Sequence, residues 1–160
     1  MNISIAPIGT IYSVFNDTET MARQSNIDGK EGRIELYAEY TAGLEGLRGF
    51  SHIIALYHFH KQAEVRLRAR PCFGKNSARG IFASRYPTRP NHIGISVLSL
   101  ERIDGNTLHC SNIDVLNGTP LLDIKPYVKH FDLLEDVRSG WYDDIDWDAV
   151  KSDCAHPEAK

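Results

Sequence analysis

Short runs of apolar residues recur along the chain, and turn-forming or polar residues separate one run from the next. The runs are rich in β-branched and aromatic residues, which is typical of β-strands, and their boundaries carry Gly, Pro, Asn or Asp. This pattern predicts strands over residues 3–13, 33–40, 51–59, 80–84, 93–103, 107–115 and 121–128, with a short helix or turn over 41–50.

One connection between these strands is specified by its turn residues. Asp104-Gly105-Asn106 separates residues 95–100 from 108–113, and Asp-Gly readily adopts the left-handed turn that matches the twist of a hairpin. No long helical pattern alternates with the strands, which argues against a doubly wound sheet and for an antiparallel barrel or sandwich. We therefore expect a mainly all-β protein: one antiparallel barrel domain over residues 1–130, with short helices or turns, and an acidic extension over 131–160.

Composition narrows the class of protein. A chain of 160 residues fits a single domain with a real core. The cysteines Cys72, Cys110 and Cys154 are odd in number and show no CxxC spacing, which favours a reducing compartment. The first residues do not resemble a signal peptide, and the best apolar run, residues 53–59, is too short to span a bilayer. We expect a cytoplasmic protein.

Charge is distributed unevenly around a net value of −3. Residues 131–160 hold nine acids against three bases, and we expect a solvated terminus anchored by Trp141 and Trp147. Residues 61–92 instead contain one acid, Glu64, and eight basic residues: Lys61, Arg66, Arg68, Arg70, Lys75, Arg79, Arg85 and Arg89. Such a segment attracts a polyanion even in an acidic protein, although a charged run is often no more than a solvated face.

The histidines raise the question of a metal. His52, His58 and His60 share strand parity, as ligands in a cupin-like barrel do. The other histidines lie in no matching pattern, so packing, hydrogen bonding or a polar ligand contact is the better interpretation. No metal is expected.

A second group of polar residues surrounds two prolines. Arg85 and Arg89 flank Pro87, and Pro90-Asn91 follows, so two guanidinium groups are carried by a stiffened loop. A guanidinium offers a planar fork of donors that suits a carboxylate or phosphate. The alternative is structural, with both arginines tied to acids of the barrel.

A third group lies on the last predicted strand. Asp123, Lys125 and Tyr127 share parity, so an acid, a base and a phenol are expected on one face. Such a row is either the wall of a site or a solvated face of the barrel.

Several of these motifs resemble one known family. Gly80-Ile81-Phe82-Ala83-Ser84-Arg85, Arg89-Pro90-Asn91-His92-Ile93-Gly94-Ile95-Ser96 and Gly118-Thr119-Pro120-Leu121-Leu122-Asp123-Ile124-Lys125-Pro126-Tyr127 are similar to signatures of the TsaA-like β-barrel family, which includes tRNA methyltransferase O. The resemblance spans roughly residues 4–130, so this chain looks like a short, barrel-only form.

The resemblance implies a homodimer that binds S-adenosylmethionine near the subunit interface and methylates the exocyclic nitrogen of threonylcarbamoyl-adenosine beside the anticodon of tRNA. The motif residues that are not implied cofactor contacts are left for catalysis, namely Asp123, Lys125 and Tyr127, and for substrate binding, namely Arg89 and Asn91. Arg68 and Arg70 of the basic segment are the further candidates for substrate binding, because their charges suit tRNA. The implied cofactor contacts are Ala22, Arg23, Gln24, His60, Lys61, Arg85, Ile95, Asp114, Val115, Leu116 and Asn117.

Three positions depart from the family pattern. His92 stands where Pro is usual, Lys61 where Gln is familiar, and Asn117 where Asp is common. Two other classes of function therefore stay open: methylation of a small metabolite, and RNA binding by a barrel without enzymatic activity. Binding of S-adenosylmethionine would distinguish either methyltransferase from an RNA-binding barrel without enzymatic activity.

Overall fold

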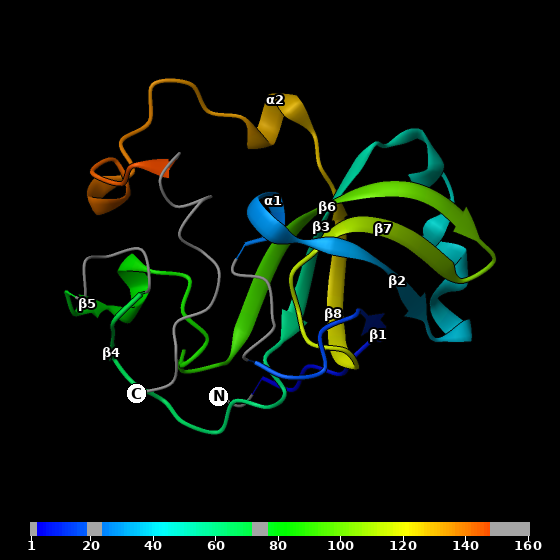
Figure 1. Ribbon diagram of the computed structural model, residues 1–160. Coiled ribbons are helices and arrows are strands. Elements are labelled where there is room, and N and C mark those ends of the chain that lie inside the picture. Colours follow the sequence, from blue (N-terminus) through cyan, green and yellow to red (C-terminus); the bar gives the residue numbers. More distant parts are fainter. Residues whose placement is uncertain (1–2, 19–23, 72–76, 148–160) are drawn as a thin grey trace.

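A closed β-barrel forms the body of the molecule (Figure 1). The computed structural model describes residues 3–18, 24–71 and 77–147. Six strands close the barrel in the order β1-β2-β7-β6-β3-β8, and every pairing is antiparallel. Their bounds are Gly9–Tyr12 (β1), Lys30–Leu36 (β2), His52–His58 (β3), Ile93–Asp104 (β6), Thr107–Ile113 (β7) and Thr119–Pro126 (β8). The predicted fold class is confirmed.

The remaining elements are short. The strands β4 (Arg68–Ala69) and β5 (Arg79–Gly80) form a separate two-stranded sheet. The α-helical turns are α1 (Ser25–Asp28) and α2 (Lys129–Asp132). The 3₁₀ turns are η1 (Ala38–Leu44), η2 (Leu47–Gly49), η3 (Ile81–Ala83) and η4 (Gly140–Tyr142), so the predicted helix or turn over 41–50 is confirmed in η1 and η2.

The barrel interior is filled by aliphatic side chains that alternate with outward-facing residues along each strand. Each fully buried aliphatic side chain contributes about 1.5–3 kcal/mol. The core is therefore contiguous around the barrel axis, and it holds the strand ends in fixed positions. Its most deeply buried members in the barrel are Ile11, Ile34, Ile53, Leu98, Leu108, Ile113 and Leu121.

Three register shifts change which residues face inward, and one of them lies in the β2–β7 pairing between Lys30 and Gly32. The β6–β7 pairing shifts between Leu100 and Arg102, so Leu98 and Ile103 are both buried although they are five positions apart. The β3–β8 pairing shifts between Leu56 and Tyr57, where Leu56 pairs with Asp123 but Tyr57 pairs with Leu121. Such bulges insert one residue and reverse the facing of everything that follows.

The predicted hairpin is confirmed. Gly105 occupies the turn between β6 and β7 with φ 59°, a left-handed conformation that glycine adopts without steric cost. Asn106 then donates its side-chain amide to the carbonyl oxygen of Leu36 at 2.6 Å, which ties the hairpin to the end of β2.

Three predicted strands differ from the structure. The strand predicted over 33–40 is Lys30–Leu36 instead, and residues 38–40 belong to η1. The strand predicted over 3–13 is confined to Gly9–Tyr12. The strand predicted over 80–84 is wrong, because residues 81–83 form η3 and the backbone N–H and hydroxyl of Ser84 both bond to the Ile81 carbonyl. Local bonds of this kind compete with a ladder for the same backbone groups.

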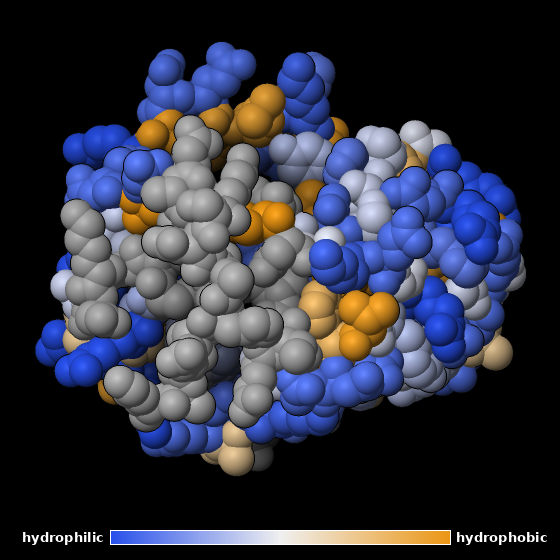
Figure 2. All heavy atoms as spheres, in the orientation of Figure 1, coloured by the Kyte–Doolittle hydropathy of each residue, from blue (hydrophilic) through white to orange (hydrophobic). Residues whose placement is uncertain are grey.

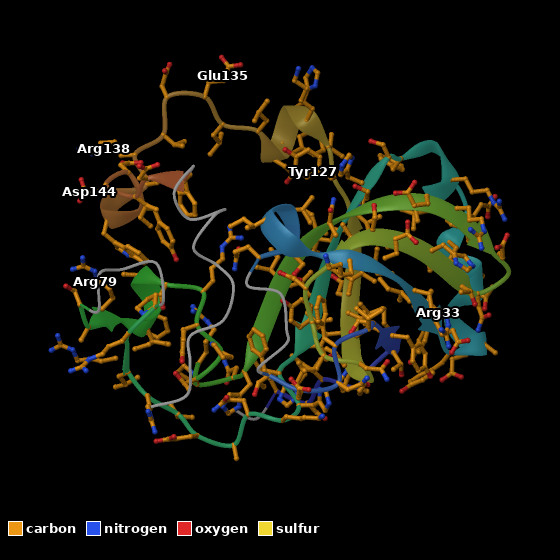
Figure 3. All side chains as sticks on the ribbon, viewed as in Figure 1. Arg33, Arg79, Tyr127, Glu135, Arg138 and Asp144 are labelled. Carbon is orange, nitrogen blue, oxygen red and sulfur yellow. The ribbon has the colours of Figure 1, made fainter. Side chains whose placement is uncertain are left out.

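Residues 61–71 and 77–92, between β3 and β6, stand beside the barrel and are called the arginine lobe below (Figure 1). The described part of the acidic extension, residues 131–147, folds back onto this lobe. The indole N–H of Trp141 donates to the Ala83 carbonyl at 2.7 Å, and the Arg79 guanidinium lies 5.5 Å from the Trp141 ring. Anchoring by Trp141 is thus confirmed, and Figure 3 shows Arg79 on the lobe near the extension that carries Asp144.

The surface and the cysteines complete the description. In the view of Figure 2 the described surface is largely hydrophilic, with scattered apolar groups. Cys110 is a buried free thiol whose pKa burial raises to about 12, whereas Cys72 and Cys154 lie outside the described residues. Within residues 3–147, less the two gaps, no helix is long and apolar enough to cross a membrane.

Candidate functional site

A small cavity of about 60 Å³ opens at the end of the barrel where β3 finishes and β8 begins. It gathers segments that lie far apart in the sequence, including parts of two that the family resemblance assigns to the cofactor: residues 60–61 and residues 115–116. The lining residues are Thr18, Phe59, His60, Lys61, Gln62, Pro87, Val115, Leu116 and Thr119.

The turn that follows β7 is held by the N-terminal segment. The hydroxyl of Ser13 donates to the Val115 carbonyl at 2.6 Å, and the backbone N–H of Asn117 donates to the Phe15 carbonyl at 2.7 Å. The Asn117 amide oxygen also accepts from the Ser13 N–H at 3.3 Å. The turn therefore has a fixed shape, and its predicted cofactor residues Val115 and Leu116 are buried against the cavity.

A buried chain of hydrogen bonds runs behind this turn. Ser96 donates its hydroxyl proton to the Asp114 carboxylate at 2.5 Å, so the Tyr57 hydroxyl, 3.0 Å away, must donate to Ser96. Burial, and then the Asp114 charge, raise the pKa of Tyr57, which keeps the phenol protonated as a donor. Asp114 is thereby positioned by two hydroxyl groups from β6 and β3.

Gly94 makes this chain possible. A Cβ at residue 94 would overlap the Tyr57 ring and lie 2.8 Å from the ring of Phe59. The two rings pack edge to face with centroids 5.4 Å apart. Because Gly94 has no side chain, the Tyr57 ring fits against its backbone, and the Tyr57 hydroxyl reaches the buried Ser96 hydroxyl.

His60 and Lys61 border the cavity on the side of β3. The Lys61 ammonium donates to the Asn16 carbonyl at 3.2 Å. Burial, followed by the charges of Lys61 and His58, lowers the pKa of His60, and its Nδ1 lies 3.5 Å from the Thr119 hydroxyl. His60 is therefore neutral at neutral pH, with a polar contact across the cavity.

The two arginines of the stiffened loop have different roles. Arg85 is exposed, and its charge acts on buried Tyr57. Arg89 is half-buried and donates through one nitrogen to the carbonyls of Ile81 at 3.1 Å and Ser84 at 2.6 Å. Arg89 thus holds η3 in place through carbonyl groups, and within the described residues it forms no ion pair with an acid.

His92, where the family resemblance predicts Pro, has a left-handed backbone conformation. His92 has φ 50°, whereas proline is restricted to about −65°. Its ring nitrogen lies 3.2 Å from the Glu64 carbonyl, and its ring packs edge to face against His58. His92 therefore connects the lobe to β3 in a conformation that the usual residue cannot adopt.

The row on β8 borders a different cavity. Asp123 and Lys125 share a face, as predicted, and form an ion pair of 2.7 Å with each other. Asp123 lines a cavity of about 570 Å³ with residues of η1 and η2. It lies four residues from Thr119, or about 13 Å along a strand. The catalytic role of the row stays a prediction, and Figure 3 shows Tyr127 at the α2 end of β8.

The other predicted site residues are dispersed. Ala22 and Arg23 lie outside the described residues, and Gln24 precedes α1. Ile95 is 47% exposed and faces outward from β6. The exposed predicted substrate residues are Arg68, Arg70 and Asn91.

Some lining residues were not predicted. Thr119 lies inside a recognised motif but was assigned no role, and Tyr57 reads in sequence as an ordinary buried strand residue. Only the parity of Tyr57 with Ile53 and Ala55 indicates that it faces inward. As for metals, the described residues contain no group of three His, Cys, Asp or Glu side chains able to hold an ion.

Comparison with known proteins identifies the family of the chain and a solved structure with the same fold. The model of the tRNA-methyltransferase O N-terminal domain matches residues 10–133, which include the whole barrel except Gly9. The chain belongs to the tRNA methyltransferase O family. A crystal structure of TrmO from Pseudomonas aeruginosa superposes on 88% of the chain with TM-score 0.73 and 38% identity.

Two relatives within the family carry informative names. A Pyrococcus abyssi protein named a probable S-adenosyl-L-methionine-binding protein is 44% identical over 87% of the chain. The human tRNA (adenine(37)-N6)-methyltransferase is 33% identical over 85% of the chain. The chain spans 76% of the Pyrococcus protein, 62% of the Pseudomonas structure and 32% of the human enzyme.

Proposed function

We propose that this chain is a cytoplasmic, S-adenosylmethionine-dependent tRNA methyltransferase that modifies the exocyclic nitrogen of threonylcarbamoyl-adenosine beside the anticodon. The observation that carries the proposal is the convergence of residues 60–61 and 115–116 around one cavity. The family and the names of its relatives agree with it.

The residues around the cavity fit the chemistry of the cofactor. Phe59, Val115 and Leu116 offer an apolar wall for adenine, Lys61 and Arg85 are cations for the carboxylate, and Asp114 is an acceptor for the ammonium or hydroxyl groups. Sites that enclose a ligand of this size have about 300–1,000 Å³, so much of the cofactor would lie against the surface around the 60 Å³ cavity.

A second copy of the chain would complete such a site. Ile95, a predicted cofactor contact, faces away from the barrel interior, and its outward neighbour Val97 is also exposed. Two exposed aliphatic residues on one strand face suit burial against a partner. We therefore propose a homodimer in which the outer face of β6 contributes to the interface.

The arginine lobe is the proposed surface for tRNA. Arg68 and Arg70 are exposed on or beside β4, and Glu64 is already bonded to Arg66 at 2.6 Å. The ring of Phe82 is 76% exposed on the same lobe. Exposed cations beside an exposed aromatic ring fit a nucleic acid strand, which offers phosphates and base faces.

When bound, the cofactor supplies a methyl group that is already activated on a sulfonium. The protein must then orient the acceptor nitrogen, exclude water and receive one proton. A carbamoylated nitrogen loses its proton more readily than a bare adenine amine, so a modest base is sufficient.

The proposal is tested with labelled S-adenosylmethionine and tRNA that either carries or lacks threonylcarbamoyl-adenosine, followed by nucleoside mass analysis. Label is expected only in the modified adenosine. Cofactor binding without transfer to tRNA would indicate a small acceptor, and tRNA binding without cofactor binding would indicate a non-enzymatic RNA-binding barrel. In calorimetry, Arg85→Ala should weaken cofactor binding about tenfold, since a charge-assisted contact contributes roughly 1.5–3 kcal/mol.

A further inference from the structure

The hydrogen bonds of Thr119 assign the protonation state of His60. The Thr119 hydroxyl has one proton, and it donates this proton to the Leu116 carbonyl at 2.7 Å. His60 Nδ1 lies 3.5 Å from the same oxygen, and because the Thr119 proton is already donated, a hydrogen bond at this contact must run from Nδ1–H to Oγ1. The neutral ring then carries its proton on Nδ1 and a free lone pair on Nε2.

The surroundings of His60 disfavour its charged form. Burial comes first, and the charges of Lys61 and His58 act in the same direction on its pKa. The residues that line the cavity from other segments, namely Thr18, Pro87, Val115, Leu116 and Thr119, are all uncharged. No carboxylate of the described residues lines this cavity, so nothing there favours an imidazolium.

Other candidates for a proton acceptor are less well placed. Tyr57 is buried and protonated, and its proton is committed to Ser96. Asp114 already accepts from Ser96, and Asp123 lines the other cavity, where it is paired with Lys125. A neutral imidazole at the cavity has an unused acceptor nitrogen, and its pKa range suits a general base.

We propose that Nε2 of His60 accepts the proton released by the acceptor nitrogen, an inference that rests on the proposed function. The bond from nitrogen to the methyl carbon forms as the carbon–sulfur bond breaks, and sulfur keeps that electron pair. The N–H proton passes to Nε2, and the imidazolium later gives it to water. Thr119 is a positioning residue, because its oxygen holds Nδ1–H and so directs the lone pair of Nε2.

The ring state is measured first, by NMR on the free protein with labelled histidine. His60 should show the Nδ1–H tautomer at pH 7.5 and titrate below the ordinary value of 6.5. Thr119→Val keeps the shape but removes the hydroxyl, so the tautomer preference should weaken, whereas Thr119→Ser should restore it. An Nε2–H tautomer in the parent protein would overturn the proposal without any reference to activity.

Single-turnover transfer to threonylcarbamoyl-tRNA is then followed against pH for the parent, for His60→Gln and for His130→Gln, an exposed control in α2. Because the imidazole accepts a proton only when neutral, the parent rate should fall as pH drops through the NMR value. His60→Gln should lower the rate at least about 100-fold and remove this acid limb, and the fall in rate should be at least about tenfold larger than any fall in cofactor affinity.

The outcomes separate the two proposals. A parent rate of zero with tRNA contradicts the proposed function, and the proton-acceptor role falls with it. An active parent combined with a His60→Gln variant that keeps its rate or its acid limb contradicts only the role of His60. If the rate and the cofactor affinity of His60→Gln fall by the same factor, His60 is a binding residue and the proposal is wrong.

Discussion

The barrel and the arginine lobe are stabilised in different ways. The barrel has six strands in a closed ladder around almost completely buried aliphatic residues such as Ile34, Ile53 and Leu108. The lobe has two strands of two residues each, and much of its order comes from side chains bonded to carbonyls, as in Arg89 to Ser84 and Trp141 to Ala83. Arg68, Arg70 and the ring of Phe82 remain exposed.

Substitutions in the barrel and in the lobe should therefore change different properties of the protein. Val115 and Leu116 form part of the wall of the small cavity and are buried in the turn that follows β7, so cofactor affinity should depend on the integrity of this end of the barrel. Arg68 and Arg70 of the lobe are exposed, so their loss should change association with a polyanion and leave the barrel intact.

The largest effect is expected inside the barrel, for Gly94→Ala. The added methyl group would overlap the buried Tyr57 ring and approach Phe59, and overpacking of this kind typically costs about 1–3 kcal/mol or more. In a protein of this size that lowers the thermal midpoint by at least about 2 °C. Gly43→Ala in η1 is the control, because its Cβ would meet nothing within 4 Å. Equal midpoints would contradict the close packing at residue 94.

A smaller, mixed effect is expected for Ser96→Ala. This change leaves the Tyr57 hydroxyl and one Asp114 oxygen without their shared partner, at a cost of roughly 1–3 kcal/mol. Chemical denaturation should show the loss of stability, and calorimetry should show cofactor binding weakened about tenfold as Asp114 loses its position. Ser99→Ala on the same strand is the control, since Ser99 bonds to the exposed His52. Unchanged cofactor affinity in Ser96→Ala would separate Asp114 from the cofactor site.

In the lobe, Arg68→Glu combined with Arg70→Glu should act on tRNA alone. We expect tRNA binding to be about tenfold weaker at 0.1 M salt. The slope of log K against log salt concentration should fall in magnitude by about one to two, while stability and cofactor affinity stay unchanged. Arg33→Glu with Arg48→Glu changes the charge equally on β2 and η2, away from the lobe (Figure 1). If both double variants weaken tRNA binding to the same degree, the lobe is not the tRNA surface.

The smallest effect is expected for Asp123→Asn. Asp123 and Lys125 are both largely exposed, and an ion pair of this kind contributes about 0–1 kcal/mol. If the chemistry takes place at the small cavity, the single-turnover rate should change by less than about threefold, with Glu101→Gln on the exposed edge of β6 as control. A loss of more than about tenfold at unchanged stability would return the catalytic site to the β8 row.

Much of the fold was predictable because its signals are local. Strand composition and an Asp-Gly turn placed four of the barrel strands, from residues 51–59 to 121–128, and the β6–β7 hairpin with small boundary errors. The error at residues 80–84 arose because Ser84 and Arg89 satisfy the carbonyls of η3 through side chains. Apolar composition alone does not reveal such bonds.

By itself the sequence determined the barrel class, the family and the segments that carry polar chemistry, since each depends on residues close together in the chain. Only the tertiary structure decided which of these segments meet. Ser96 and Tyr57 are 39 residues apart, and His60 and Thr119 are 59 apart, so their contacts depend on how β3, β6 and β8 pair. The shift between Leu56 and Tyr57 also set the facing of β8, because one bulged residue reverses the side of every residue beyond it.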